Sequence, residues 1–199
     1  MVSMPRRSYQ HYCAIGRALD VVGDRWSLLI VRELCGGARR YSDLFADLPG
    51  ISTDVLATRL RELEGDGLVV RRKIGPRAGA SVYELTHEGR SLRPVLASLG
   101  DWGAHRLGER GDQDAVRAHW LAFPLGGRIA EQIGAGTVNV RIGAEQPFHV
   151  VVGDGAVEHR DGEIDTADVD LELDLDAAIA VVRGERSIDS ARSGGTERL

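Results

Sequence analysis

Five polar residues between positions 52 and 61 are the strongest candidates for contact with a ligand. Within residues 52–67, leucines stand at positions 56, 60 and 63, and at 100° per residue they centre one buried face of a helix. The opposite face is polar, and the major groove of DNA admits a helix whose side chains hydrogen-bond to base edges. The candidates are Ser52, Thr53, Asp54, Thr58 and Arg61.

The residue types suggest separate roles on this helix. Ser52 is predicted to be the N-cap, and the free N–H groups near Ser52 and Thr53 can meet a phosphate. Arg61 can pair with a guanine edge or with the DNA backbone. A purely local alternative stays open, in which Asp54 complements the helix dipole and Arg61 pairs with a neighbouring glutamate.

A second set of candidates is basic and lies on both sides of this helix. Residues 68–74 are β-branched and basic, 75–80 are turn-like, and 82–85 form a returning strand, which predicts a hairpin. Arginine at a hairpin tip can reach the minor groove or its phosphates. A solvated surface without DNA contact is the alternative. The candidates are Arg39, Arg40, Arg72, Lys73 and Arg77.

The order of the predicted elements would place these candidates on one domain. Apolar periodicity predicts helices over 12–22, 26–35 and 41–48, ahead of the polar-faced helix and the hairpin. That order is typical of a winged helix-turn-helix, in which the hairpin is the wing. A further helix is predicted from Thr86 to Leu107, with Pro94 kinking it near its start. It is too apolar to face water alone, so we expect a partner subunit and a homodimer.

Charge separates the two halves of the 199-residue chain. Residues 1–110 carry 17 arginines and lysines against 13 acidic residues, a net charge of +4. Residues 111–199 carry 8 against 17, a net charge of −9. Because a domain that neutralises phosphates should be locally basic, the DNA-binding domain is predicted at 1–110. The polar stretch 108–114 is the predicted linker, and a second domain follows at 115–199.

The second domain is predicted to be α+β, and so is the chain as a whole. Residues 116–133 and 176–182 have helical patterns, whereas 137–142, 148–152 and 169–173 are strand-like. We expect an antiparallel sheet. Its apolar residues either line a pocket for an apolar effector or fill a core, and the sequence leaves both open. The pocket candidates are Trp120, Phe123, Leu125, Ile129, Ile133, Val150, Val152 and Leu171.

The two cysteines differ in their surroundings. Arg17 follows Cys13 by one helical turn, and a cationic neighbour lowers the pKa of a thiol. Cys13 is therefore either a redox sensor or a small packed side chain. Cys35, at a glycine-rich helix end, is expected to be structural.

Other function classes lack support in the sequence. The six histidines are dispersed, so no metal site is predicted. No nucleophile, base and orienting acid cluster, so neither an enzyme nor a cofactor is expected. The acidic residues between 165 and 176 alternate along a strand and indicate a solvated face. No apolar run is long enough for a membrane span, and the N-terminus lacks a signal peptide, which predicts a cytoplasmic protein.

The first domain resembles the HxlR family of winged-helix regulators, relatives of the MarR group. The matching segments are Cys13 and residues 24–34, 39–44, 50–52, 56–63, 67–69 and 83–89. The resemblance implies a homodimer that binds double-stranded DNA at two symmetry-related half-sites. It also implies that a cysteine at the place of Cys13 senses electrophiles in some members.

The second domain is similar to the sterol carrier protein fold through residues 168–174, 177–180 and 184–195. That resemblance implies a helix and a sheet around an apolar tunnel. The chain is therefore predicted to be a ligand-responsive transcriptional repressor that binds an inverted-repeat operator as a homodimer. The competing hypothesis is a carrier of lipids or apolar ligands whose winged helix mediates protein contacts.

Overall fold

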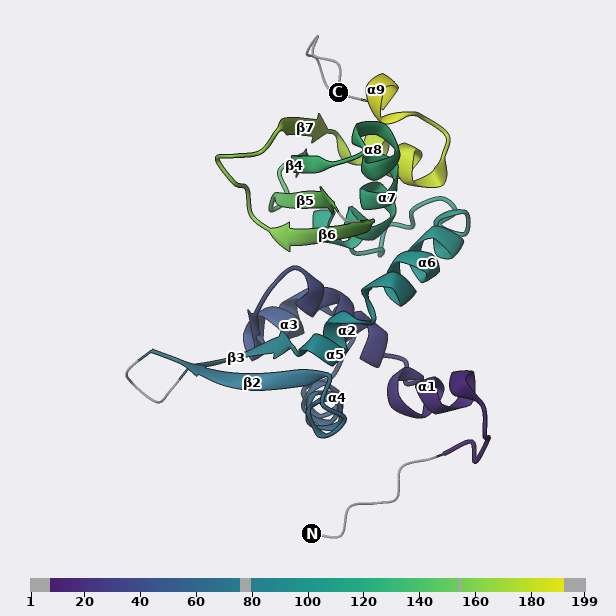
Figure 1. The fold of residues 1–199 in the computed structure, drawn as a ribbon, viewed down its shortest axis with the longest axis vertical. Helices are drawn as coiled ribbons and strands as arrows, with labels where there is room; N and C mark the ends of the chain where they lie inside the picture. Colours follow the sequence, from purple (N-terminus) through teal and green to yellow (C-terminus); the bar gives the residue numbers. More distant parts are fainter. Residues whose placement is uncertain (1–7, 76–79, 154, 192–199) are drawn as a thin grey trace. The chain divides into compact units, whose positions relative to one another are not determined.

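The structure, a computed structural model, describes residues 8–75, 80–153 and 155–191. They form two compact units (Figure 1). The first holds residues up to 92 apart from 35–37, and the second holds residues from 93 onward together with 35–37. The sequence-based boundary lay later, at 110. No described helix has the length and apolar character that crossing a membrane requires.

The first unit is the predicted winged helix-turn-helix. Its antiparallel sheet has β3 in the centre, with β1 and β2 at the edges. Its elements are α1 (Ala14–Val22), α2 (Ser27–Cys35), β1 (Arg39–Arg40), α3 (Tyr41–Asp47), α4 (Thr53–Gly65), β2 (Val69–Ile74), β3 (Ala80–Leu85) and α5 (His87–Arg90). Helix α2 runs to Cys35, which groups with the second unit. The short strand β1 was not predicted.

Helix α4 has the cap, the buried face and the terminating glycine that were predicted for it. The Ser52 hydroxyl accepts a hydrogen bond from the Val55 N–H at 3.3 Å, which caps the first turn. Leu56, Leu60 and Leu63 are buried. Gly67 then has a φ of +72°, a left-handed conformation that favours glycine.

Helix α5 is held close to the turn that follows α4. The Thr86 hydroxyl donates to the Gly67 carbonyl at 2.6 Å and accepts from the Gly89 N–H at 3.0 Å. The backbone approach is so close that a Cβ on Gly89 would lie 2.1 Å from the Leu68 carbonyl oxygen. Only glycine fits at this position.

The single long helix predicted from Thr86 to Leu107 is wrong. The chain forms α5 and then a separate helix, α6 (Arg93–Ala104), which belongs to the second unit. Pro94 explains the break, because its ring would clash with the Arg90 carbonyl in a continuous helix and it has no N–H to donate. Proline is tolerated in the first turn of the new helix.

The second unit combines helices with a four-stranded sheet in the order β6-β5-β4-β7. Its elements after α6 are the 3-10 helix η1 (Ala118–Leu121), α7 (Ala122–Ile133), β4 (Gly136–Ile142), β5 (Phe148–Gly153), β6 (Ala156–Asp161), β7 (Val169–Leu173), α8 (Leu175–Arg183) and α9 (Ile188–Ala191). The α+β fold is confirmed.

The sheet of this unit differs from the prediction at one pair of strands. β4 and β7 are parallel, with Val138 opposite Val169 and Ile142 opposite Leu173. The sheet is therefore mixed. Residues 162–168 carry the chain from the edge strand β6 to β7 at the opposite edge of the sheet. Asn139 fixes this crossing, since its side-chain amide exchanges two 3.0 Å hydrogen bonds with the backbone of Ile164. Strand β6 was not predicted.

The core of the second unit lies between the sheet and helices α7 and α8 (Figure 1). Alternate residues of the strands point into it, which follows from the two-residue period of a strand. Strands β4, β5 and β7 contribute Val138, Val140, Ile142, Phe148, Val150, Leu171 and Leu173. Both helices add residues such as Ile129 and Ala178, which are fully buried.

Candidate nucleic-acid interface

The structure leaves the outer face of α4 available to a ligand. Ser52, Thr53, Asp54 and Arg61 are exposed, and Thr58 is half-buried. The Arg61 guanidinium donates to the Ala57 carbonyl at 3.2 Å and to the Thr58 hydroxyl at 3.0 Å. Both partners are neutral and lie on the same helix. Within residues 8–75, 80–153 and 155–191, no carboxylate pairs with Arg61.

The alternative of a local ion pair applies to a different arginine. Arg59 pairs with Glu62 at 2.6 Å and also with Asp24. Arg59 therefore connects α4 to the turn before α2 through its ion pair with Asp24. Arg61 is exposed and takes no part in this ion pair. Arg59 was not among the predicted contacts. Its partner Asp24 is 35 positions away in the sequence, so no local pattern indicates the pair.

The start of α4 is also fixed from the side of α3. The Tyr41 hydroxyl donates to the Thr53 carbonyl at 2.8 Å. Burial raises the pKa of Tyr41, and nearby Tyr83 and Asp54 raise it further. Tyr41 thus stays a neutral hydrogen-bond donor at the position where α4 presents its first polar residues.

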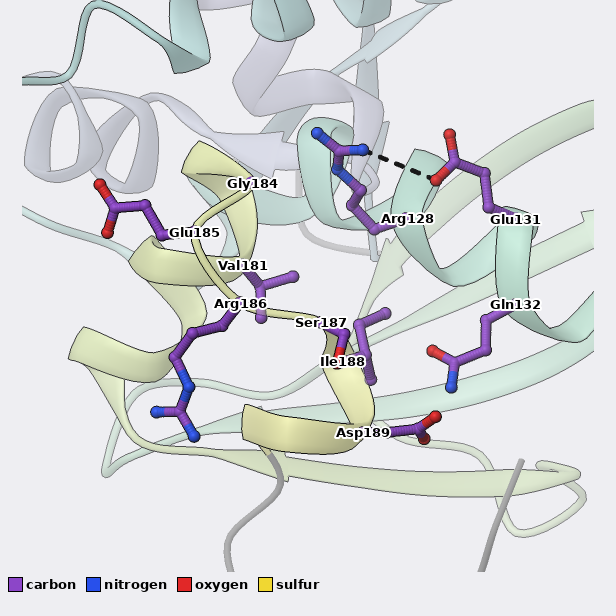
Figure 2. A pocket seen from close by; sticks show the side chains of 10 residues that line it. All are labelled: Arg128, Glu131, Gln132, Val181, Gly184, Glu185, Arg186, Ser187, Ile188 and Asp189. Carbon is purple, nitrogen blue, oxygen red and sulfur yellow. Dashed lines mark ion pairs between the residues drawn. The ribbon is translucent and has the colours of Figure 1, made fainter.

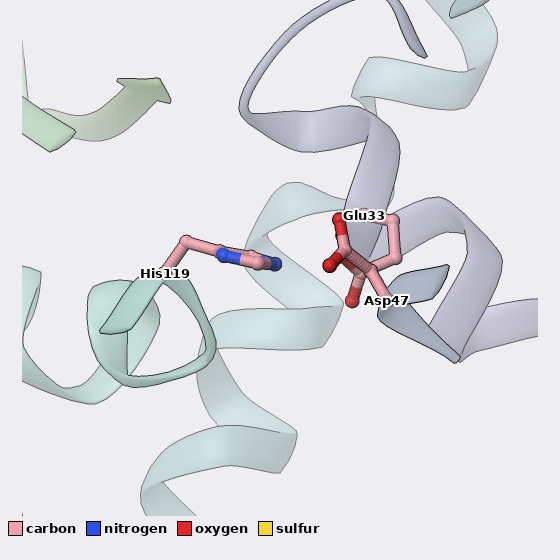
Figure 3. A group of neighbouring side chains, drawn as sticks. All are labelled: Glu33, Asp47 and His119. Carbon is pink, nitrogen blue, oxygen red and sulfur yellow. The ribbon is translucent and has the colours of Figure 1, made fainter. Parts of the chain in front are cut away.

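The structure corrects the prediction that Arg39 contacts DNA. Its side chain is only 13% exposed. The guanidinium donates to the Glu33 carbonyl at 2.8 Å and pairs with the Asp47 carboxylate at 3.2 Å. Glu33 and Asp47 lie close together (Figure 3). The third residue drawn there, His119, belongs to the second unit. Arg39 therefore joins α2 to α3 and is not free to bind a phosphate.

The other basic candidates are on the surface of the wing sheet. Arg40, Arg72 and Lys73 are exposed. Arg72 pairs with Glu84 on the neighbouring strand at 2.6 Å, which compensates its charge. Arg77 lies outside the described residues.

The cysteines lie in contrasting places. Cys35 is buried, as expected for a structural residue, whereas Cys13 is exposed at the start of α1. Within the single chain Cys13 is therefore not packed in the core. Arg17 pairs with Asp20 at 3.6 Å. Redox sensing by Cys13 stays a prediction.

Most of the predicted pocket residues fill the core of the second unit. Leu125, Ile129, Val150, Val152 and Leu171 are buried in one continuous cluster. At its margin, Ile133 packs against the cluster. Trp120 is half-buried beside Arg117, and Phe123 makes an edge-on contact with His159 at 4.7 Å between ring centres. Of the two interpretations that the sequence allowed, a ligand pocket or a filled core, the filled core accounts for these residues.

A hollow of about 530 Å³ in the second unit lies next to α7, α8 and α9. Figure 2 shows two basic residues, Arg128 and Arg186, and three acidic residues, Glu131, Glu185 and Asp189, around the hollow, with Arg128 directed toward Glu131. Arg128 pairs with Glu131 at 3.6 Å. None of the predicted pocket residues lines this hollow. With charges of both signs, it differs from the apolar pocket that the sequence suggested.

Comparisons with known proteins place the likeness in the first part of the chain. Residues 21–110 match the HxlR-like helix-turn-helix family. An uncharacterized HTH-type transcriptional regulator of Synechocystis sp., sll1512, is 40% identical over 99 residues, which make up 49% of this chain and 69% of that protein. YvaP of Bacillus subtilis, described in the same words, is 40% identical over 43% of this chain and 80% of its own.

A solved structure, the reduced form of the transcriptional regulator YodB from B. subtilis, is 32% identical. It covers 51% of this chain and 100% of its own, with a TM-score of 0.42.

Proposed function

Because the chain belongs to the HxlR-like helix-turn-helix family, we propose that it represses transcription by binding an inverted-repeat operator as a homodimer. DNA binding and transcriptional regulation follow from the family. Repression, the operator symmetry and the dimer are the proposal. The observation that carries it is the outer face of α4, which presents exposed polar groups and an arginine without a described carboxylate partner.

The geometry of α4 supports insertion into the major groove. Its buried leucines hold the inner face of the helix against the core. The N–H groups of its first turn have no partner within the helix, and the Ser52 hydroxyl occupies only that of Val55, so an anion can approach this end. Arg61 lies about two turns further along the same helix. An arginine there can reach a guanine edge, a contact that discriminates between bases by roughly 1–3 kcal/mol.

Two exposed apolar stripes support the homodimer. In the first unit, Tyr12, Ile15 and Leu19 are exposed at helical spacing along α1 and the residues before it. In the second unit, Leu99 and Trp102 are exposed on α6. Contiguous apolar surface of this kind is stabilised by a partner, and a second copy is the partner that an inverted-repeat operator requires.

Regulation by a ligand is assigned to the second unit in this proposal. The family match ends at residue 110, so it includes α6 but leaves the four-stranded sheet and helices α7 to α9 of the second unit outside. Release from DNA follows if an effector binds one dimer geometry more tightly than the DNA-bound geometry. The likeness of this unit to sterol carrier proteins remains a hypothesis, and an apolar effector would have to displace side chains from a filled core.

The direct test of the α4 contact compares two arginine variants in a gel shift on DNA upstream of the protein's own gene. Arg61→Ala should weaken binding by tenfold or more, about 1.4 kcal/mol, with little change in melting temperature. Arg160→Ala, an exposed arginine of β6, removes the same charge and should bind like the wild type. If Arg61→Ala lowered the melting temperature clearly as well as the affinity for DNA, the arginine would have a role in folding instead.

The dimer is tested by light scattering on the full chain. The wild type should have twice the monomer mass of 21.6 kDa. Leu99→Glu should shift the protein toward monomer. The matched substitution Val151→Glu, at an exposed apolar residue of β5, should leave the dimer intact. A wild-type protein that stays monomeric at micromolar concentration contradicts the proposal.

A further inference from the structure

A polar hollow of about 400 Å³ lies on the wing sheet of the first unit, apart from the outer face of α4. One wall comes from the junction of β1 and α3, and the other comes from β2 and β3. The side chains that matter are Arg40, Tyr41, Ser42, Arg71, Ser81 and Tyr83. Strand pairing brings the walls together, since Arg40 of β1 is opposite Val82 of the central strand β3, which also pairs with β2.

The arginines of this hollow differ from their immediate neighbours in the sequence. Arg39 and Arg72 each pair with a carboxylate, of Asp47 and Glu84 respectively. Arg40 and Arg71 are exposed, and neither has an ion pair among the described residues. The neutral ring of Tyr83 lies 5.8 Å from the Arg71 guanidinium, close enough for a cation–π contact that orients it. The hollow therefore has positive charge that the described part of the protein does not neutralise.

The hydroxyl groups around the hollow are not equivalent. Ser42 donates to the Asp43 carboxylate at 3.1 Å, and the same carboxylate accepts the Arg40 backbone N–H at 3.1 Å. Ser81 is half-buried and lies on the same face of β3 as Tyr83, because side chains alternate along a strand. Arg71 of β2 is opposite Tyr83 and is therefore on the same face of the sheet. Ser81 is thus the hydroxyl best placed to bind an anion together with Arg71.

The hollow is connected to the start of α4. Tyr41 forms part of its wall, and the Tyr41 hydroxyl donates to the Thr53 carbonyl at 2.8 Å. An anion bound in the hollow would therefore be held at a fixed position relative to the first turn of α4. In protein–DNA complexes, backbone phosphates held in this way set the register of the base contacts.

We propose that this hollow binds one phosphate of the DNA backbone, with Arg40 and Arg71 supplying the positive charge and Ser81 a hydrogen bond. Guanidinium groups match the oxygens of a phosphate in pairs, which favours this anion over a single-atom ligand. The inference rests on the proposed function, because it assumes that α4 contacts the same duplex. It adds a phosphate contact that orients the protein without selecting a sequence.

The test measures how duplex binding depends on salt. The logarithm of the binding constant of the full chain is followed against the logarithm of salt concentration with one fixed duplex. Each neutralised phosphate contributes a slope of about −0.9, so Arg71→Ala should reduce the slope by about that amount. Arg71→Lys should largely retain the slope, because it keeps the charge. Arg160→Ala is the matched control and should leave the slope unchanged, and all variants should keep the wild-type melting temperature.

Three outcomes decide against the proposal in different ways. A wild-type protein that binds no duplex at low salt overturns the proposed function itself. Wild-type binding with an unchanged slope in Arg71→Ala overturns only the phosphate contact. A titration with inorganic phosphate, followed by NMR chemical shifts, separates the two sources of the anion. Saturable phosphate binding that Arg71→Ala abolishes, together with an unchanged DNA slope, would assign the hollow to a free anion instead.

Discussion

Both units of this protein pair some of their arginines with carboxylates, but the first unit also gathers arginines with no described ion pair around α4 and the wing sheet. In the first unit, Arg40, Arg61 and Arg71 are exposed and have no carboxylate partner among the described residues. In the second, several arginines are paired, and Arg93, Arg141 and Arg160 each lie against a glutamate. A unit with uncompensated positive charge can take phosphates as its counterions. The unpaired arginines and the net charge both support the DNA contact that we propose for the first unit.

The units also differ in where their apolar residues lie. The second unit surrounds its core with sheet and helices, and residues from three strands are fully buried. The first unit buries the inner face of α4 but leaves Tyr12 and Ile15 largely exposed. The second unit thus closes its own core but leaves Leu99 and Trp102 of α6 exposed, so each unit has apolar surface that a partner can cover.

The largest expected effect tests whether the second unit is filled or hollow. Leu171→Ala should lower the free energy of unfolding by about 3 kcal/mol, because Leu171 is fully buried in the core and its removal leaves a cavity. Urea unfolding measures the change. Val151→Ala, on the exposed face of β5, is the control and should cost less than about 0.5 kcal/mol. A loss below about 1 kcal/mol in Leu171→Ala would indicate a side chain that lines a hollow.

An intermediate effect compares one buried glycine from each unit. Gly89→Ala should destabilise the first unit by about 2 kcal/mol, because the new Cβ would lie 2.1 Å from the Leu68 carbonyl oxygen. The Cβ of Gly126→Ala in α7 would lie 2.9 Å from the Val157 Cγ1 and at an ordinary contact distance of 3.8 Å from the Val150 Cγ1, and Val157 is partly exposed. That side chain can shift, and the helix gains about 1 kcal/mol from alanine.

Thermal unfolding of the two glycine variants should therefore differ clearly, with Gly126→Ala close to the wild type. Equal melting temperatures for Gly89→Ala and the wild type would show that the backbone at Leu68 can move away from a Cβ at position 89 at little cost in stability. That result would contradict the prediction.

The smallest effect concerns acid stability of the second unit. The hydrogen bond from Arg93 lowers the pKa of Glu158, and the charges of Arg93 and Arg160 act in the same direction against the opposing effect of burial. A lowered folded-state pKa contributes stability above the ordinary value of 4.5 and loses it as pH falls through the folded value. Glu158 is 42% exposed, so solvent screening limits the contribution to about 0.5 kcal/mol.

Urea unfolding at several pH values tests this prediction. Glu158→Gln should be less stable than the wild type at neutral pH, and the difference should narrow below pH 4. Glu145→Gln, at an exposed position between β4 and β5, controls for the loss of one carboxylate. A difference that stays constant with pH would contradict the role of the ionised Glu158.

The sequence predicted the elements whose signal is local. The leucine spacing and the serine cap of α4, the wing strands and the α+β character of the second unit all follow from residues that are neighbours in the chain. The parallel pairing of β4 with β7 did not, since it depends on a crossing held by Asn139 and Ile164. The break before α6 could have been predicted, because Pro94 alone is sufficient to interrupt the helix.

The same distinction applies to the candidate site. Exposed residues of α4 were predicted because their positions follow from one helical period. The burial of Arg39 was missed, since it depends on Glu33 and Asp47 from two other helices. Arg71 was missed because only the register with Tyr83 shows which face of the strand it occupies. Tertiary partners, more than residue type, decide which arginines remain available for DNA.

The central claim is that two copies of the first unit bind one duplex through matching α4 helices. Hydroxyl-radical footprinting of the full chain on DNA upstream of its own gene tests it most directly. Two protected patches of inverted sequence, with centres about 10 base pairs or one helical turn apart, are the predicted result. A single patch, or no protection at low ionic strength, would contradict it.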